Sequence, residues 1–183
     1  MTEFQSINEK LDSDSKEEKI RILESLTSEK DPNIVNKIIS KLDDDDIQVR
    51  GEAFSSLVLN ENKISKLLIE NLKSSSKNIR GFSALILANR KDSEAVPSII
   101  ELTKDSSSMV RACALGALGF LKANDASNAI HSCFSDSSLE VKKSAVKAAI
   151  DIGYKLPPKE IQEISKGKDE ELEKLLVLAE KKS

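Results

Sequence analysis

The sequence predicts an all-α fold, a right-handed solenoid in which about five helical hairpins stack in series between two capping helices. A β-branched residue followed by a basic one recurs at spacings of 30, 31 and 31 residues, at Val49-Arg50, Ile79-Arg80, Val110-Arg111 and Val141-Lys142. Each pair lies in a segment with the apolar period of a helix, and a second apolar segment follows it. A regular period of this length is typical of stacked-repeat proteins.

The composition excludes several classes of protein. The chain has 183 residues, of which 39% are hydrophobic, 32% charged and 3% aromatic, and its net charge is −3. We therefore expect no nucleic-acid partner, and no segment approaches the roughly 20 apolar residues that span a membrane. The first residues contain no apolar run of signal-peptide length. Cys113 and Cys133 form no CxxC pair, so we expect a reduced, cytoplasmic protein.

The first predicted element is a helix over residues 3–11, where Phe4, Ile7 and Leu11 share one face. We interpret it as a cap that covers the apolar end of the array. A faint copy of the repeated pair follows at Ile20-Arg21, which lies 29 residues before Val49. This copy predicts a degenerate first hairpin.

The first helix of each hairpin has one apolar stripe. After Val110, apolar residues stand at offsets 4, 7, 8 and 11, which lie on one face at 3.6 residues per turn. Four glycines fall inside these helices, Gly51, Gly81, Gly116 and Gly119. Because a helical glycine costs roughly 1 kcal/mol relative to alanine, we expect close approach of neighbouring helices at these positions.

The second helices are predicted at residues 32–42, 62–72, 93–103, 126–134 and 158–165. Their apolar ends continue the period, at Leu42, Leu72, Leu102, Phe134 and Ile164. Prolines lie at or near several of their starts, where the missing N–H is least costly. Asp and Ser clusters separate the hairpins, and these residues accept hydrogen bonds from the first amides of a helix.

The last predicted element is an amphipathic helix that we interpret as a second cap, over residues 168–182. The organisation is therefore a single domain, 1–183, with hairpin units at 13–42, 44–73, 74–104, 105–135 and 136–166. No run of alternating β-branched and polar residues competes with this helical interpretation.

The stretch DSSSMVRACALGALGFL, residues 105–121, resembles the HEAT-like repeat of the phycobilisome-lyase type. The matching residues are Asp105, Val110, Arg111, Ala114, Leu118 and Gly119. The unit at 136 matches with Lys142 in place of Arg, and the unit at 44 has Val58 where the family has Gly. The resemblance covers nearly the whole chain and implies a superhelix of hairpins. Such repeats serve mainly as binding scaffolds, so it says little about function.

A basic residue follows an aspartate by six positions in three units, in the pairs Asp44/Arg50, Asp105/Arg111 and Asp136/Lys142, and Arg80 takes the basic position in a fourth. One interpretation is an anion or partner site formed by a row of basic side chains. The other, which we favour, is a structural ladder of caps and ion pairs between adjacent turns.

We predict no catalytic residue, cofactor or metal. His131 is the only histidine, and hydrolytic metal centres need several His or Cys ligands. The resemblance also raises the possibility of a HEAT-like deoxyhypusine hydroxylase. Those enzymes hold iron with His-Glu pairs, which this chain lacks. The acidic run from Asp43 to Asp46 lacks the spacing of a calcium loop. Few aromatic residues are present to stack nucleic-acid bases, and nothing marks a tetrapyrrole pocket.

We predict a non-catalytic scaffold or adaptor that binds another protein on its concave face. In solenoids of this type the second helices line that face. The candidate contacts are the polar residues Lys37, Lys41, Lys66, Glu70, Ser98, Glu101, Asn128 and Ser132. An alternative is a small enzyme or enzyme subunit of the HEAT-like lyase or hydroxylase kind. A third is a regulatory subunit phosphorylated in the serine clusters 74–76 and 106–108.

Overall fold

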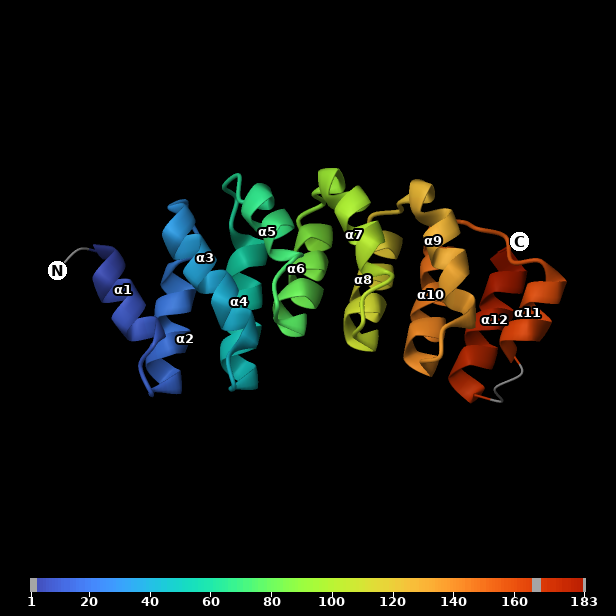
Figure 1. Ribbon diagram of the computed structural model, residues 1–183, viewed down its shortest axis with the longest axis horizontal. Coiled ribbons are helices and arrows are strands. Elements are labelled where there is room, and N and C mark those ends of the chain that lie inside the picture. Colours follow the sequence, from blue (N-terminus) through green and yellow to red (C-terminus); the bar gives the residue numbers. More distant parts are fainter. Residues whose placement is uncertain (1–2, 166–168, 183) are drawn as a thin grey trace. The chain divides into compact units, whose positions relative to one another are not determined.

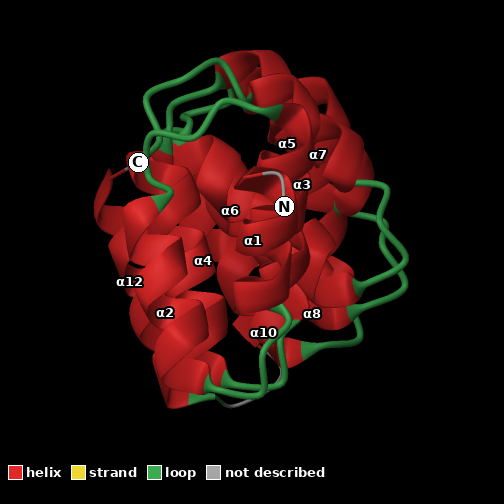
Figure 2. Ribbon diagram, turned by 90° about the vertical axis from the view of Figure 1, so that its left-hand side faces the viewer, coloured by secondary structure: helices red, strands yellow, loops and turns green. Residues whose placement is uncertain are grey.

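The computed structural model describes residues 3–165 and 169–182, and these residues form helices, turns and loops without a strand (Figures 1 and 2). The predicted fold class, an α-solenoid of HEAT-like hairpins, is confirmed. The chain divides into two compact units, residues 1–90 and 91–183. The single domain of the sequence analysis stays a prediction.

Unit 1 alternates second and first helices of successive hairpins, in the blue-to-green part of Figure 1. The first helices α2, α4 and α6 pack on one another in order, and each of α1, α3 and α5 packs on the first helix that follows it. The helices are α1 (Glu3–Leu11), α2 (Lys16–Ser25), α3 (Pro32–Ser40) with a 3₁₀ turn η1 (Lys41–Asp43), α4 (Ile47–Leu59), α5 (Ser65–Asn71) and α6 (Lys77–Asn89).

Unit 2 repeats the same scheme. The second helices α7 and α9 pack on α8 and α10, and α10 packs on both α8 and α12. The elements are η2 (Ser93–Ala95), α7 (Val96–Leu102), α8 (Ser108–Phe120), η3 (Asn124–Ala126), α9 (Ser127–Ser132), η4 (Cys133–Ser135), α10 (Leu139–Asp151), α11 (Pro158–Ile164) and α12 (Glu170–Lys182).

Short polar side chains cap several of the helices, as the Asp and Ser clusters predict, whereas Ser107 and Ser138 before α8 and α10 make no such side-chain bond. The Asp46 carboxylate accepts hydrogen bonds from the amides of Gln48 (2.7 Å) and Val49 (3.3 Å) at the start of α4. The Ser76 hydroxyl accepts one from the Ile79 amide at 3.3 Å, at the start of α6. Each such cap satisfies amides that have no partner inside the helix.

The repeated apolar stripes form the core of each unit. In α4, the side chains of Val49, Ala53 and Leu57 are fully buried, and α8 buries Val110, Ala114, Ala117 and Leu118 in the same register. The offsets of 4, 7 and 8 residues are therefore confirmed as the packing face of the first helices.

The glycines do not share one role. A Cβ atom added to the buried Gly119 would lie 3.0 Å from the Cα of Ala148, so α8 and α10 approach closely there. Gly51 is exposed with nothing within 4 Å of an added Cβ, and Gly116 is exposed as well. The expectation of close packing is confirmed at Gly119 and wrong at Gly51, because the latter faces away from the neighbouring helices.

Both predicted caps are half-repeats. Leu172 of α12 lies 31 residues after Val141, it is 1% exposed, and the Asp169 carboxylate caps its amide at 2.9 Å. Helix α12 therefore takes the place of a first helix beside α10. Leu11, fully buried, lies 31 residues before Leu42 and puts α1 in the place of a second helix. Residue 168, where the predicted cap begins, lies outside the described residues.

A network of amide and guanidinium groups joins the loops of unit 1. The buried Asn60 donates to the Glu29 carbonyl at 2.6 Å, and Asn62 donates to the Ser28 carbonyl at 2.9 Å. Arg90 donates to the carbonyls of Asn60 and Asn62. These bonds satisfy carbonyl groups at two successive turns and connect them to Arg90 at a third.

Candidate protein-binding surface

The predicted contacts on α3 and η1 are held in an ion-pair cluster. Lys37 and Lys41 both donate to the carboxylate of Asp12, at 2.5 and 3.0 Å. The hydrogen bond from Lys37 is the main reason that the pKa of Asp12 lies below its usual value. The two ammonium groups are therefore directed toward the turn that follows α1.

The predicted contacts on α5 are more accessible. Lys66 and Glu70 are exposed and stand one helical turn apart. Beside them, Asn71 donates to the side-chain oxygen of Asn36 at 3.1 Å and links α5 to α3. The second helices of unit 1 thus present a polar surface on which a side-chain hydrogen bond connects neighbouring helices.

In unit 2, the predicted contacts lie on α7 and α9. Glu101, Asn128 and Ser132 are exposed, and Ser98 is half-buried. The Ser132 hydroxyl donates to the Asn128 carbonyl of its own helix at 2.9 Å, which reduces its availability to a partner.

A polar pocket of about 250 Å³ lies between α9 and α11. The lining residues are His131, Phe134, Ser135, Lys142, Glu160, Glu163 and Ile164. The His131 Nε2 atom lies 3.0 Å from Glu160 Oε1, whereas Glu160 Oε2 is buried and has no hydrogen-bond partner among the described residues. An unpaired buried carboxylate oxygen can accept a hydrogen bond from a ligand.

Aromatic rings stabilise one side of this pocket. The ring centroid of His131 lies 5.4 Å from that of Phe134 and 6.4 Å from that of Tyr154, both in edge-to-face geometry. Burial raises the pKa of Tyr154, and the negative charge of Glu160 adds to this rise. The pocket therefore combines carboxylates with a rigid aromatic wall.

The sequence analysis did not select Glu160 or the His131 pair. The two residues lie 29 positions apart, which is close to one repeat, so equivalent positions on successive second helices could have indicated the contact. The sequence contains no adjacent His-Glu pair, and this pairing arises only when two hairpins stack.

Three arginines of the repeated pairs donate to the backbone carbonyl of the residue six positions before them. Arg50 donates to the Asp44 carbonyl at 2.7 Å, Arg80 to the Ser74 carbonyl at 2.8 Å and Arg111 to the Asp105 carbonyl at 2.8 Å. Each guanidinium thus fastens the turn in front of its own helix. Lys142, at the same position in the last hairpin, lines the α9–α11 pocket.

The carboxylates of Asp44 and Asp136 pair with bases one hairpin away. Arg111 binds Asp136 through two hydrogen bonds of 2.8 and 2.9 Å, and Lys19 binds Asp44 at 3.0 Å. The Arg111 hydrogen bond is the largest cause of the lowered pKa of Asp136. The Asp44 and Asp136 side chains also accept from the amides of Asp46 and Ser138. We call this series of bonds between neighbouring hairpins the carboxylate ladder.

Neither cysteine has the surroundings of a nucleophile. Burial raises the pKa of the Cys113 thiol to about 11 and also raises the pKa of Cys133. The Cys133 sulfur lies 3.8 Å from the Thr103 carbonyl. Within residues 3–165 and 169–182, no group of three or more His, Cys, Asp or Glu side chains could hold a metal ion.

Comparison with known families identifies the repeat. Residues 65–150, from α5 to α10, match the family model of HEAT repeats. This part of the chain therefore consists of HEAT-like repeats. A search of curated proteins found no significant match. No helix in the described part of the chain has the length and apolar character needed to cross a membrane.

Solved structures share the fold over the whole chain. A designed armadillo repeat protein in complex with the peptide (KR)4 is 18% identical, with 99% of each chain covered and a TM-score of 0.58. A crystallised engineered protein is 18% identical over 100% of this chain and 96% of its own, with a TM-score of 0.57. The complex of CpcE and CpcF of phycocyanin lyase from Nostoc sp. PCC7120 gives 21% identity, coverage of 97% and 75%, and a TM-score of 0.58. At these identities the likeness concerns the fold.

Proposed function

We propose that this HEAT-like protein is a non-catalytic scaffold in the cytoplasm, whose second helices bind a segment of another protein. Two structural neighbours support this proposal, since one is a designed armadillo repeat protein in complex with a peptide and the other is the complex of CpcE and CpcF of phycocyanin lyase. Lys66, Glu70, Glu101, Asn128 and Ser132, on α5, α7 and α9, are exposed, so both compact units present polar side chains to a partner.

The observation that carries the proposal is the unpaired oxygen of Glu160 in the α9–α11 pocket. A buried acceptor without a partner costs about 1–3 kcal/mol, and a ligand that donates a hydrogen bond recovers this cost. Glu160 and Glu163 also outnumber the one ammonium group of Lys142 in the lining. We therefore propose that the partner segment places an arginine or lysine side chain in this pocket.

A peptide titration tests the proposal directly. A fluorescent peptide of alternating Lys and Arg is the probe, and an acidic peptide of equal length is the control for charge. We expect anisotropy to report binding of the basic peptide and a loss of about tenfold or more in affinity for E160Q/E163Q. The matched control is E140Q, because Glu140 is an exposed carboxylate on α10 outside the pocket lining. Equal affinities for the pocket variant and the control would exclude the pocket as the binding site.

The predicted contacts on α5 need a separate test. We expect K66E/E70K to retain its helical circular dichroism and to lose the partner in an affinity pull-down from source cells analysed by mass spectrometry. K77E is the control, because Lys77 is an exposed basic residue on the first helix α6. Retention of the partner by K66E/E70K would remove α5 from the binding surface.

The likeness to the phycocyanin lyase complex favours a second candidate, an enzyme subunit of the lyase kind. This candidate predicts a bound pigment or metal in protein purified from its own cells. Visible absorption and elemental analysis of that material distinguish it from a simple scaffold.

A further inference from the structure

The carboxylate ladder has one step at which a serine stands in place of the aspartate. Asp44, Asp105 and Asp136 recur at one position of the repeat, and Ser74 holds that position before α6. The Ser74 hydroxyl accepts a hydrogen bond from the Ser76 amide at 3.2 Å, as each aspartate accepts one from the amide two residues further on. A hydroxyl performs this part of the role but carries no negative charge. The step from α4 to α6 therefore lacks an anion of its own.

The base at this step is Arg50. In α8 the equivalent Arg111 uses Nη1 on the backbone before its own helix, and it uses Nε and Nη2 on the carboxylate of Asp136. Arg50 uses Nη1 in the same way, on the carbonyls of Asp44 and Asp45. Its Nε and Nη2 atoms donate to no residue among those that the structure describes. The edge of a guanidinium that can bind a carboxylate with two parallel hydrogen bonds is thus open at Arg50.

An apolar groove of about 270 Å³ lies beside Arg50, between α4 and α6, and we call it the α4–α6 groove. Its lining residues are Ile47, Arg50, Gly51, Phe54, Phe82 and Leu85. The rings of Phe54 and Phe82 meet edge to face with centroids 6.4 Å apart, and Ile47 is 72% exposed. The guanidinium of Arg50 is the one charged group of this lining. The groove therefore favours a ligand that has both an apolar group and a negative charge.

The acidic run before α4 does not occupy this guanidinium. Asp43 accepts a hydrogen bond from Asn78 at 2.8 Å, and Asp44 binds Lys19 at 3.0 Å. The Asp46 carboxylate caps the first amides of α4. The fourth carboxylate of the run is exposed to solvent, where its charge is screened. Each carboxylate of this turn thus has another partner or faces water, and the turn offers only backbone oxygen to the guanidinium.

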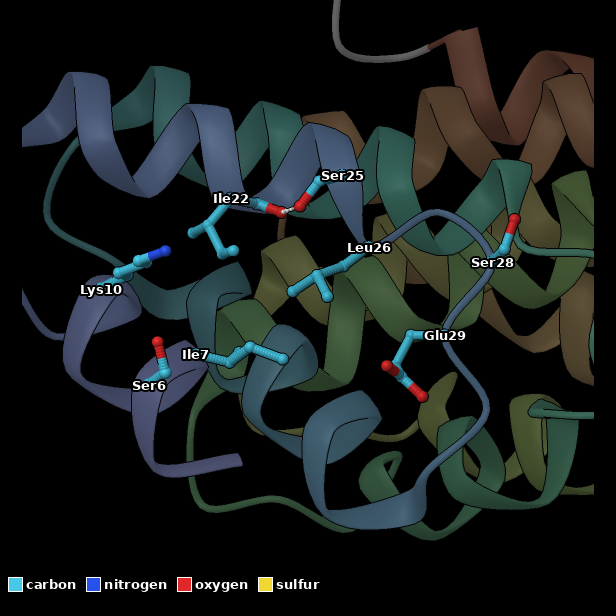
Figure 3. Close-up of a pocket in the computed structure, with 8 residues that line it drawn as sticks. All are labelled: Ser6, Ile7, Lys10, Ile22, Ser25, Leu26, Ser28 and Glu29. Atoms are coloured by element: carbon cyan, nitrogen blue, oxygen red, sulfur yellow. Dashed lines mark hydrogen bonds between the residues drawn. The ribbon is translucent and has the colours of Figure 1, made fainter. Parts of the chain in front are cut away.

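The groove between α1 and α2, shown in Figure 3, lacks this combination. It has a volume of about 500 Å³, and Ile7, Ile22 and Leu26 are directed into it. Lys10 and Glu29 belong to the same lining and carry opposite charges. This groove therefore favours neither sign of ligand charge, and it serves as a reference for the α4–α6 groove.

The spacing along α4 indicates the form of a ligand for the α4–α6 groove. Arg50 and Phe54 lie one helical turn apart, about 6 Å along the helix axis. In an extended segment, alternate side chains point to the same face at a spacing of about 7 Å. Gly51 lies between the two contacts, and nothing lies within 4 Å of a Cβ atom added there, so a backbone can approach α4 closely. An acidic residue and a large apolar residue with one residue between them fit this spacing.

We infer that the α4–α6 groove binds an extended segment of another protein that carries an aspartate or glutamate two residues from a large apolar residue. The carboxylate of the segment binds Nε and Nη2 of Arg50 and so supplies the negative charge that Ser74 lacks. The apolar side chain lies over Gly51 against the rings of Phe54 and Phe82. This surface belongs to first helices and takes an acidic segment, whereas the scaffold surface proposed above belongs to second helices and takes a basic one. The two sites can therefore be tested independently.

Two short peptides test the charge of the ligand. The probe is fluorescein-labelled Gly-Asp-Ala-Phe-Gly with an amidated carboxyl end, and the matched control carries Asn in place of Asp. We expect fluorescence anisotropy to show an affinity for the Asp peptide about tenfold or more above that for the Asn peptide, because only a carboxylate pairs with Arg50. Equal affinities for the two peptides would overturn the inference.

Variants locate the bound peptide. We expect R50Q to lose about tenfold or more in affinity for the Asp peptide, and G51L to lose as much by filling the groove without a change of charge. K10Q is the matched control, because it removes an exposed positive charge from the groove between α1 and α2, and it should bind as wild type does. E160Q/E163Q should also bind as wild type does, and circular dichroism checks that each variant is folded. A loss of binding in E160Q/E163Q with no loss in R50Q and G51L would place the peptide in the α9–α11 pocket and contradict the inference.

Substitution of Ser74 tests the vacant ladder position. S74D supplies the missing carboxylate within the chain, so we expect it to raise the urea midpoint of unfolding and to weaken binding of the Asp peptide about tenfold or more. S75D is the matched control, since Ser75 is exposed and adjacent, and it should change the affinity by less than about twofold. Unchanged binding by S74D would count against Ser74 as the vacant position. Phosphate on Ser74, found by mass spectrometry of protein from its own cells, would assign the position to a modification and would also overturn the inference.

Discussion

The contact between α4 and α6 in unit 1 differs from the contact between α8 and α10 in unit 2. In unit 2, Gly119 lets the helices approach until an added Cβ would lie 3.0 Å from Ala148. In unit 1, Phe54 and Phe82 meet edge to face with centroids 6.4 Å apart and leave an apolar groove of about 270 Å³. The same repeat therefore allows a close and an open contact, and the size of a few side chains decides between them.

The largest expected effect comes from filling the close contact. Gly119→Leu places a side chain where Ala148 Cα and Asp151 Oδ2 lie 3.0 and 3.1 Å from the first added carbon. We expect unit 2 to lose about 3 kcal/mol of stability through overpacking. Urea unfolding followed by circular dichroism measures this loss. Gly51→Leu is the control, because nothing lies within 4 Å of its Cβ, and a loss as large as that of Gly119→Leu would contradict the comparison.

Thiol labelling reports on unit 2 alone, since Cys113 and Cys133 are the only cysteines of the chain. Burial raises the pKa of Cys113 from 9.0 to about 11, so at pH 8 its thiolate is about 100-fold scarcer than that of an ordinary thiol. We expect Cys113 to react with a disulfide reagent at least about 100-fold more slowly in native protein than in 6 M urea. Equal rates would show that unit 2 opens readily. Gly119→Leu should accelerate native labelling, whereas Gly51→Leu should not.

We expect substitutions in the carboxylate ladder to change stability by an intermediate amount. Arg111 holds Asp136 with two hydrogen bonds, whereas one bond joins Lys19 to Asp44. We expect Asp136→Asn to cost about 2 kcal/mol and Asp44→Asn about 1 kcal/mol at neutral pH. Chemical denaturation of the two variants measures the difference. Similar losses would mean that the second bond of Arg111 adds no stability.

The same pair predicts a dependence on pH. The Arg111 hydrogen bond lowers the pKa of Asp136 below 3.8 in the folded protein, so the ionised carboxylate stabilises the fold. This contribution is complete well above pH 3.8 and is lost as the pH falls through the lower folded pKa. Stability measured from about pH 6 to pH 3 should therefore fall less steeply in Asp136→Asn than in wild type.

The smallest expected effect is a gain. Gly51→Ala adds a methyl group in open space within α4, so we expect about 0.5–1 kcal/mol of added stability from the better helix propensity. A shift of the urea midpoint to higher concentration measures it. A loss of stability would show that a neighbouring side chain lies too close to Gly51 to accept the added methyl group.

The helices could be predicted because their causes are local. The offsets after Val110 and the caps at Asp46 and Ser76 depend on residues within two turns of each other. The pairing of Glu160 with His131 and of Asp136 with Arg111 could not be predicted, because it depends on how one hairpin lies on the next. The places that the two end helices take in the repeat could not be predicted, for a related reason. Leu172 and Leu11 continue the two periodic series, but only the packing of α12 on α10 and of α1 on α2 shows which helix each replaces.

The carboxylate ladder has a mechanical consequence. Lys19 reaches Asp44 and Arg111 reaches Asp136, each 25 residues further along the chain, and His131 reaches Glu160 over 29 residues. Bonds between residues this close in sequence cost little loop-closure entropy. A hairpin can therefore dock as soon as the hairpin before it has folded. When the chain is pulled, we expect the hairpins of each compact unit to detach and unfold one at a time, rather than the whole unit at once. Each step would then release the residues of about one repeat from the folded array.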